Sequence, residues 1–203
     1  QAVVTVSVSA ASIIANDDAG NSVNGLSGGI SFTNVLINDL LNGNPVIPSE
    51  VTLTFVSSTN PGITLNGSDV VVAPGTLAGN YTLIYQICET LNPSNCDQAV
   101  VTVPVTDNEA PEIVCPPAIT INCISELPPA FTSLDEFLAA GGTVNDYNGI
   151  NLATFALVSQ ISDNQSCPET ITRTYSIADL SGNIGYCAHT IIIDDQIDPI
   201  LTV

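Results

Sequence analysis

The sequence has almost no positive charge. Its 203 residues contain one Lys or Arg, which is Arg173, against 20 Asp and Glu residues, and the formal net charge at pH 7 is -19. A surface with this charge repels the phosphates of nucleic acids and the headgroups of anionic lipids. The composition therefore excludes nucleic acid as a charge-driven partner, and it makes metal cations the natural counter-ions.

Long apolar runs, tryptophan and catalytic motifs are also missing. No apolar run reaches the roughly 18 residues that a membrane-spanning helix needs, so we expect no direct membrane insertion. The absence of Trp removes the ring that most often stacks on sugars. With a single His and no nucleophile, metal-protease or phosphate-loop motif, we predict that the chain is not an enzyme. We expect His189 to be an ordinary strand residue, Arg173 to pair with a nearby carboxylate and Asp179 to cap a turn.

What the sequence does contain is typical of β-structure. Val, Ile, Thr, Ser, Asn and Gly dominate, and turn-forming residues separate the apolar stretches. The pattern predicts strands over residues 1–9, 32–36, 51–57, 69–73, 81–88, 97–105, 170–178 and 184–193. One short helix is predicted over residues 133–141, because Ser133 and Glu136 have the spacing of a capping box and Gly141 is a natural stop.

A short acidic frame occurs twice, about 88 residues apart, as tandem modules do. Asp107 and Pro111 in the first copy match Asp195 and Pro199 in the second, and residues 1–8 resemble residues 98–105. The chain is long enough for two modules of about 90 to 100 residues. We therefore predict four parts: residues 1–9 as the last strand of a preceding module or a donated strand, 10–106 and 107–194 as two β-sandwiches, and 195–203 as the first strand of a following module.

Carboxylate and amide side chains gather at these boundaries. Ca²⁺ takes about six to eight oxygen ligands from such groups and from backbone carbonyls, and a bound ion would stiffen the joint. The alternative is that these side chains cap turns and keep edge strands soluble. The candidate Ca²⁺ ligands are Asp17, Asp18, Asp39, Asp107, Asn108, Glu109, Asp194, Asp195 and Asp198.

Several motifs carry a family likeness. Residues 14–18 (IANDD) and 35–39 (VLIND) resemble motifs of cadherin-like and bacterial immunoglobulin-like repeats. Residues 110–116 (APEIVCP), residues 174–183 (TYSIADLSGN) and Cys187 resemble the hyalin-repeat type of immunoglobulin-like module. The combination is similar to repeats in the very large cell-surface adhesins of Bacteroidota, including the gliding-motility adhesin exported by type IX secretion. The resemblance implies tandem immunoglobulin-like β-sandwiches in an extracellular stalk or filament.

The six cysteines indicate disulfide bonds. Their spacing does not supply the paired clusters of a zinc site, and disulfides place a protein outside a reducing cytoplasm. Cys88 and Cys96 flank a turn between two predicted strands, so we expect them to face each other and pair.

The four cysteines of the second module can pair in three ways. An extended segment from Cys115 to Cys123 would span about 26 Å. Because a disulfide brings two Cα atoms to about 5.5 Å, that pairing requires a sharp bend. If the first strand of the module runs parallel to the last, as in many immunoglobulin-like sandwiches, Cys115 meets Cys187 and Cys123 meets Cys167. We predict this second arrangement.

Together these interpretations predict a non-enzymatic spacer in an extracellular repeat adhesin at the cell surface. Its expected partners are neighbouring modules and a surface ligand such as a polysaccharide. One alternative is a fibre subunit that polymerises by strand donation through residues 1–9. Another is an accessory module of a secreted hydrolase.

Overall fold

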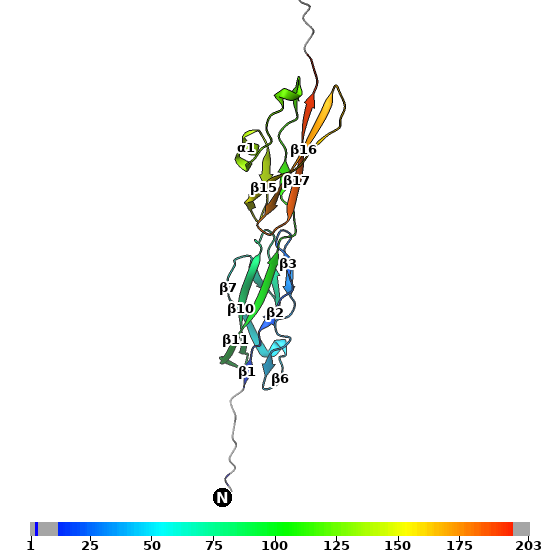
Figure 1. Cartoon of the computed structure of the whole chain (residues 1–203). Helices are drawn as coiled ribbons and strands as arrows, with labels where there is room; N and C mark the ends of the chain where they lie inside the picture. Colours follow the sequence, from blue (N-terminus) through cyan, green and yellow to red (C-terminus); the bar gives the residue numbers. More distant parts are fainter. Residues whose placement is uncertain (1–2, 4–11, 197–203) are drawn as a thin grey trace, which may run out of the picture. The chain divides into compact units, whose positions relative to one another are not determined.

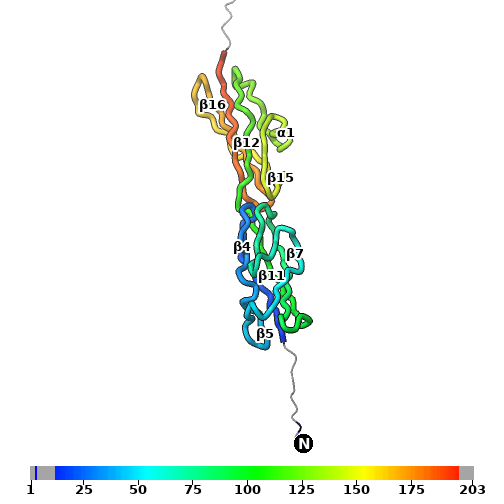
Figure 2. The backbone as a smooth tube through the Cα atoms, turned by 180° about the vertical axis from the view of Figure 1, so that it is seen from behind, coloured from blue at the N-terminus to red at the C-terminus, as the bar shows by residue number. Residues whose placement is uncertain are grey.

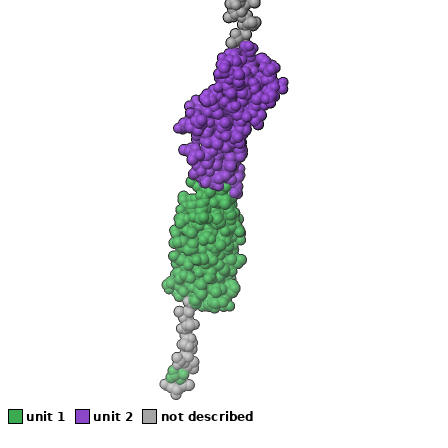
Figure 3. Space-filling model, viewed as in Figure 1, with its two compact units in different colours: residues 1–107 green, residues 108–203 purple. Residues whose placement is uncertain are grey.

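Two compact units make up the chain, residues 1–107 and residues 108–203 (Figure 3). The computed structural model describes residue 3 and residues 12–196, so the strands predicted over 1–9 and 195–203 lie almost wholly outside the described part. Strands dominate both units, which confirms the predicted all-β fold (Figure 1). Within the described residues, no helix is long and apolar enough to cross a membrane.

The first unit is a β-sandwich built around a long hairpin. Its larger sheet contains β7 (Val51–Ser58), β10 (Gly79–Glu89) and β11 (Asn92–Thr106) in antiparallel pairing, with β2 (Asp18–Ala19) and β3 (Val23–Asn24) parallel to β11. The other strands form two small sheets, which are β4 (Gly29–Phe32), β9 (Asp69–Val72) and β8 (Ile63–Asn66), and β1 (Ile13–Ile14), β5 (Leu40–Leu41) and β6 (Asn44–Pro45). Figure 2 shows β4 and β5 from the opposite side of the molecule, and the 3₁₀ turn η1 (Pro48–Glu50) precedes β7.

The core of this unit follows the alternation of its two longest strands. Leu83, Tyr85 and Ile87 of β10 are fully buried, as is Val101 of β11. Because alternate side chains of a strand share a face, one face of the hairpin covers a single continuous core. The strands predicted near residues 51–57, 69–73, 81–88 and 97–105 are confirmed, with ends displaced by a few residues.

The strand predicted over residues 32–36 is wrong. The structure has β4 at Gly29–Phe32, and the following residues form a turn in which Asn34 has φ of 56°. Val35 and Leu36 are nevertheless buried, at 0% and 6% exposure. Asn tolerates the left-handed region, so an apolar pair enters the core from a turn and mimics a strand in the sequence.

The second unit is a smaller sandwich with one helix. Its main sheet has the order β13 (Ile119–Ile121), β17 (Ile184–Ile193), β16 (Glu169–Asp179) and β15 (Ile150–Ser162). β12 (Glu112–Val114) pairs with β14 (Thr143–Asn145), and η2 (Ile124–Glu126) follows β13. The predicted hairpin over 170–178 and 184–193 is confirmed. The disulfide prediction assumed that the first strand of the module runs parallel to the last, but the first strand, β12, pairs with β14, and it is the second strand, β13, that runs parallel to β17.

The predicted helix is α1 (Leu134–Ala139), shorter than its sequence signal. The Ser133 hydroxyl accepts a hydrogen bond from the Glu136 backbone N–H at 3.3 Å, as an N-cap should. The Glu136 carboxylate also accepts from the Thr132 backbone N–H at 2.8 Å. Phe137, on the inner side of α1, is fully buried against Phe155 at 5.1 Å between ring centroids.

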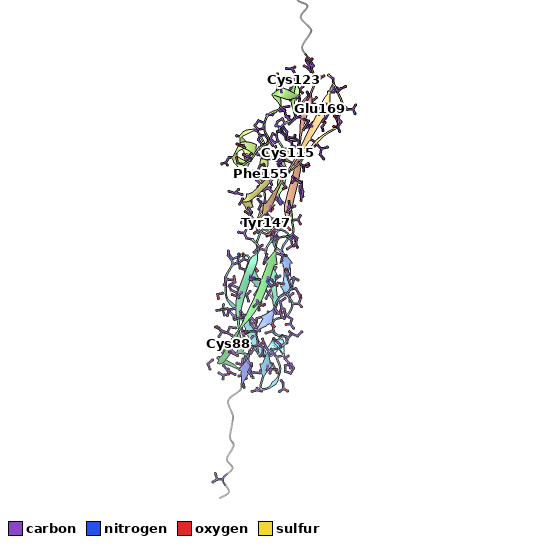
Figure 4. The ribbon with its side chains drawn as sticks, in the orientation of Figure 1. Cys88, Cys115, Cys123, Tyr147, Phe155 and Glu169 are labelled. Carbon is purple, nitrogen blue, oxygen red and sulfur yellow. A yellow bond between two sulfur atoms is a disulfide. The ribbon has the colours of Figure 1, made fainter. Side chains whose placement is uncertain are left out.

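Two of the three predicted disulfides are present. Cys88 pairs with Cys96, and the two residues are register partners of β10 and β11. Cys115 pairs with Cys187 across 72 residues of sequence (Figure 4). Each unit therefore carries a covalent cross-link of its own.

The predicted disulfide between Cys123 and Cys167 is absent, and both residues are exposed free thiols. Strand order gives the reason. Cys123 follows β13 and Cys167 precedes β16, and these two strands flank β17 on opposite sides. Two strand spacings of about 4.8 Å exceed the Cα separation of a disulfide.

Candidate functional site

A buried polar cluster lies inside the first unit. It contains Asp39 at 0% exposure, Asp18 at 6% and Tyr85 at 0%. Asp18 begins β2, Asp39 directly precedes β5, and Tyr85 is in the middle of β10. Two of the candidate Ca²⁺ ligands, which the sequence placed at a boundary between modules, are therefore in the interior of a module.

The Tyr85 hydroxyl is the centre of this cluster. It lies 3.1 Å from each carboxylate oxygen of Asp39, 3.0 Å from the carbonyl oxygen of Val35 and 3.1 Å from that of Asn16. Asp39 Oδ1 also accepts a hydrogen bond from the Asn16 backbone N–H at 2.8 Å. Asp18 faces Tyr85 as well, yet its buried Oδ2 has no hydrogen-bond partner.

Burial makes ionisation in the cluster unfavourable. Desolvation, with a further contribution from the charge of Asp39, raises the pKa of Asp18 to about 6. Desolvation also raises the pKa of Asp39, against hydrogen bonds from Asn16 and Tyr85. Burial, together with the two carboxylates, raises the pKa of the Tyr85 hydroxyl far above its ordinary value, so Tyr85 is neutral. Ionisation of both buried acids at once is therefore unfavourable.

Asp17 has a different environment from its neighbour. Its side chain is exposed, and its Oδ1 accepts a hydrogen bond from the Val100 backbone N–H at 2.8 Å. Asp97 Oδ2 similarly accepts from the Ala15 backbone N–H at 2.9 Å. Both carboxylates thus accept backbone N–H groups from distant segments of the first unit.

The second unit brings two further carboxylates together. A carboxylate oxygen of Asp146 and one of Asp179 lie within 4.8 Å of each other. Tyr147, which follows Asp146, lies at the end of the unit opposite Cys123 (Figure 4). Asp146 Oδ1 also accepts the Asn148 backbone N–H at 2.7 Å.

Asp179 is held by its own turn. Its Oδ1 accepts the backbone N–H groups of Ser181 at 2.8 Å and Asn183 at 2.9 Å, and its Oδ2 accepts the Asn183 side-chain amide at 2.7 Å. Burial opposes ionisation of Asp179, but these hydrogen bonds outweigh it and lower the pKa below its ordinary value. The predicted role of Asp179 as a turn cap is confirmed.

The chain enters the second unit beside this turn. A side-chain carbon placed on Gly185 would lie 2.1 Å from the carbonyl oxygen of Pro111, so the entering backbone packs directly against the start of β17. Asn108 and Glu109 are exposed residues of this entering segment, and Asp107 is the last residue of the preceding unit.

Asp194 and Asp195 follow the end of β17. Asp194 Oδ1 is 3.5 Å from Cys167 Sγ, and its Oδ2 accepts the Gln196 side-chain amide at 3.3 Å. Asp195 is exposed, and Asp198 lies outside the described residues.

Sequence reasoning did not single out Asp146 or Tyr85. Asp146 belongs to no recognised motif, and Tyr85 fits the alternation of an ordinary core strand. Asp179 was recognised only as a turn residue. The only sequence signal for Asp146 and Asp179 was that each lies beside turn-forming residues, as in residues 146–149 (DYNG).

The only Arg and the only His of the chain serve the fold of the second unit. Arg173 donates to the side-chain oxygen of Gln160 at 2.7 Å and to the carbonyls of Pro128 and Pro129 at 2.7 and 3.1 Å. The predicted ion pair of Arg173 with a carboxylate is therefore wrong. His189 is buried in β17, and desolvation lowers its pKa, so the imidazole is neutral.

No family model matches the chain, and no curated protein is found to be similar. Solved structures with some similarity are cadherin ectodomains. The human desmocollin-1 ectodomain matches at 8% identity and a TM-score of 0.43, covering 91% of this chain and 42% of that one. A protocadherin gammaB7 EC3-6 structure matches at 12% identity and 0.45, covering 91% and 52%.

A human CDH23 EC21-23 structure matches at 14% identity and a TM-score of 0.46, covering 91% of this chain and 69% of that one. The chain thus spans about half the length of the first two structures. Similarity at this level transfers neither a function nor a set of ligands to the chain.

Proposed function

We propose that the chain is a structural repeat segment of an extracellular cell-surface adhesin or filament, in which consecutive sandwiches form a stalk. The observation that supports this best is that each of the two units has its own buried core and its own disulfide. Units of this kind can be added in series, because each one does not depend on its neighbour for its core. Disulfides of this kind persist outside a reducing cytoplasm.

The proposal includes Ca²⁺ at the entrance of the second unit. Asp146 and Asp179 supply two close carboxylates there, and Asp179 is ionised and held in place by its turn. Asp107, Asn108 and Glu109 are the acidic and amide residues at the boundary between the two units. Ca²⁺ prefers such oxygen ligands, and an ion bound by the entering segment would restrict bending of the joint.

The motif resemblances support a narrower form of the proposal. Under it, the stalk belongs to a large adhesin of Bacteroidota, exported by type IX secretion and used in gliding motility. The surface ligand, for example a polysaccharide, would then be bound by another part of the same adhesin.

Antibodies against this chain test the cellular part of the proposal. They should label intact cells that make the full-length protein, and brief protease treatment of intact cells should remove the label. Labelling that appears only after lysis would contradict an extracellular stalk.

Small-angle scattering of the 203-residue chain tests the calcium part. In Ca²⁺ the chain should sample a narrower range of sizes than in EGTA, and Asp146→Asn should abolish the difference. Asp135→Asn is the matched control, because Asp135 is exposed on α1 and the charge change is the same. Equal curves for the unaltered chain with and without Ca²⁺ would exclude a stiffening ion.

A further inference from the structure

We propose that Asp18, Asp39 and the oxygen atoms around the Tyr85 hydroxyl form a buried binding site for a hard divalent cation inside the first unit. This site is separate from the one proposed at the entrance of the second unit. It would stabilise the fold of a single module and does not require a neighbouring module. This proposal therefore does not depend on the proposal that the chain is part of a stalk.

Charge balance is the first argument. Residues 1–107 contain no Lys, Arg or His, because the only Arg of the chain is Arg173 and its only His is His189. Asp18 and Asp39 are nonetheless 94% or more buried, at 6% and 0% exposure. Buried carboxylates without a paired cation are very unfavourable, so proteins pair them, protonate them or place a metal beside them. No side chain of this unit can do the pairing.

The number of hydrogens is the second argument. A tyrosine hydroxyl has one proton to donate. Four acceptor oxygens surround that of Tyr85 at 3.0 to 3.1 Å, and they come from Asn16, Val35 and both carboxylate oxygens of Asp39. When Asp39 is ionised, at least two of these contacts therefore place oxygen against oxygen with no hydrogen between them. Such crowding is repulsive unless a positive ion lies among the oxygens.

The unsatisfied Asp18 oxygen is the third argument, and it is independent of the hydroxyl. Asp18 Oδ2 is buried and accepts no hydrogen bond, while the same carboxyl faces Tyr85 and Asn38. A buried acceptor without a donor costs about 1 to 3 kcal/mol or more when it is charged. A cation contacting this oxygen would remove that penalty.

The ligand set defines the class of ion. Carboxylates, backbone carbonyls and a neutral hydroxyl are hard oxygen ligands, and no thiol or imidazole is present in the cluster. Hard oxygens bind Ca²⁺ at about 2.3 to 2.6 Å with variable geometry, whereas Mg²⁺ requires a near-ideal octahedron and retains water. Two carboxylates balance the charge of one divalent ion. We therefore infer Ca²⁺ as the preferred occupant.

An ion at this position would join three segments that are far apart in sequence. Asp18 belongs to β2, Asp39 to the turn before β5, and Tyr85 to β10. The two small strands have only two residues each, so few backbone hydrogen bonds hold them. The cation would add a further attachment of these strands to the main hairpin.

Hydrogen exchange of the full chain, measured by mass spectrometry with and without Ca²⁺, tests the proposal. Peptides from β10 and β11 report on the first unit, and peptides from β16 and β17 report on the second. At free Ca²⁺ about 100 times the dissociation constant, the amides of the first unit that exchange by unfolding should exchange about 100-fold more slowly. Asp18→Asn should abolish this slowing and, in EGTA, should leave exchange no faster than in the unaltered chain.

Matched variants separate the two calcium sites. Asp17→Asn makes the same charge change one residue away on an exposed side chain, and it should keep the Ca²⁺ response. Asp146→Asn should also keep the response of the first unit. If Asp18→Asn does not fold, Asp39→Asn replaces it, because its amide oxygen can still accept the Asn16 N–H. The proposal would be overturned if Ca²⁺ did not slow hydrogen exchange in the first unit, or if it slowed exchange equally in the unaltered chain and in Asp18→Asn.

Discussion

Asp18 in the first unit and Asp179 in the second are both nearly inaccessible to solvent, at 6% and 1% exposure, yet their pKa values shift in opposite directions. Asp179 accepts three hydrogen bonds within its own turn, whereas Asp18 Oδ2 accepts none. Desolvation is the largest cause of the raised pKa of Asp18, whereas the hydrogen bonds of the turn outweigh desolvation at Asp179. The balance between desolvation and local donors therefore decides whether a buried carboxylate is stable as an anion. In the second unit, hydrogen bonds from the turn stabilise the buried carboxylate of Asp179. In the first unit, the carboxyl of Asp18 requires a proton or a cation.

The units also differ in their covalent cross-links. The disulfide of the second unit spans 72 residues of sequence, and that of the first spans 8. Constraint of the unfolded chain grows with the length of the closed loop. The disulfide should therefore contribute more to the free energy of unfolding of the second unit than to that of the first. The buried acids should make the stability of the first unit the more sensitive to Ca²⁺ and pH.

Removing the disulfides should give the largest effect. Replacing Cys115 and Cys187 with Ala should lower the free energy of unfolding of the second unit by about 4 kcal/mol, against about 2.5 kcal/mol for the same change at Cys88 and Cys96 in the first. Denaturant unfolding, with each unit followed by hydrogen exchange of its own peptides, measures both. A larger loss for the short loop would contradict the comparison.

Replacing the two buried acids should destabilise the second unit but not the first. Asp179→Ala leaves the Ser181 and Asn183 N–H groups without their acceptor and should destabilise the second unit by about 2 to 3 kcal/mol. Asp18→Asn, in EGTA at pH 7.5, should leave the first unit as stable as before or more stable, because it removes an unfavourable buried charge. Denaturant midpoints of the two variants report this. Destabilisation of both units by similar amounts would show that Asp18 has donors that the structure lacks.

Lowering the pH should have the next largest effect, and it should change the stability of the two units differently. The folded pKa of Asp18 is raised to about 6 from an ordinary 3.8, so the folded state binds a proton more readily than the unfolded state does. In EGTA, the first unit should therefore gain stability as the pH falls from 7.5 through 6 toward 5. Asp179 has a lowered pKa, and its contribution is lost only below the ordinary range of a carboxyl group. Thermal unfolding as a function of pH should show the gain in the first unit and no gain from Asp179 in the second.

The smallest effect concerns the free thiols. Cys123 and Cys167 are exposed and unpaired, so both should react with an aromatic disulfide reagent without denaturant. Their replacement by Ser should change the stability of the second unit by less than about 0.5 kcal/mol, as is usual for surface positions. Protection of both thiols in the native chain would indicate a bond between them, and with it a different strand arrangement from the one described here.

The sequence predicts the β10–β11 hairpin because these two long strands alternate between buried and more exposed residues, whereas β15, which does not alternate, escapes prediction. Residues 81–88 and 97–105 read as a hairpin, and the disulfide between Cys88 and Cys96 follows from it. The Cys115 pairing follows from one assumption about parallel strands, although it is the second strand of the module, β13, that runs parallel to β17. The error at Cys123 and Cys167 arises because strand order, unlike strand identity, depends on contacts that are remote in sequence.

The candidate sites are less predictable for the same reason. The sequence identifies Asp18 and Asp39 by their motifs but cannot show that Tyr85, which is 46 residues beyond Asp39, lies against them. It likewise identifies the Asp179 turn but not the approach of Asp146. Local motifs name individual ligands, and only the packing of the sandwich reveals which of them converge.

The most direct test is a crystal structure of the chain grown with Ca²⁺ and then with Tb³⁺, which scatters anomalously and occupies calcium sites. The predicted result is an anomalous peak in contact with Asp18 Oδ2 and Asp39. Oxygen atoms of Asn16, Val35 and Tyr85 should surround the ion. A cluster without a peak, in which Asp18 is protonated and donates a hydrogen bond to Asp39 or Tyr85, would contradict the central claim that a cation balances the buried acids of the first unit.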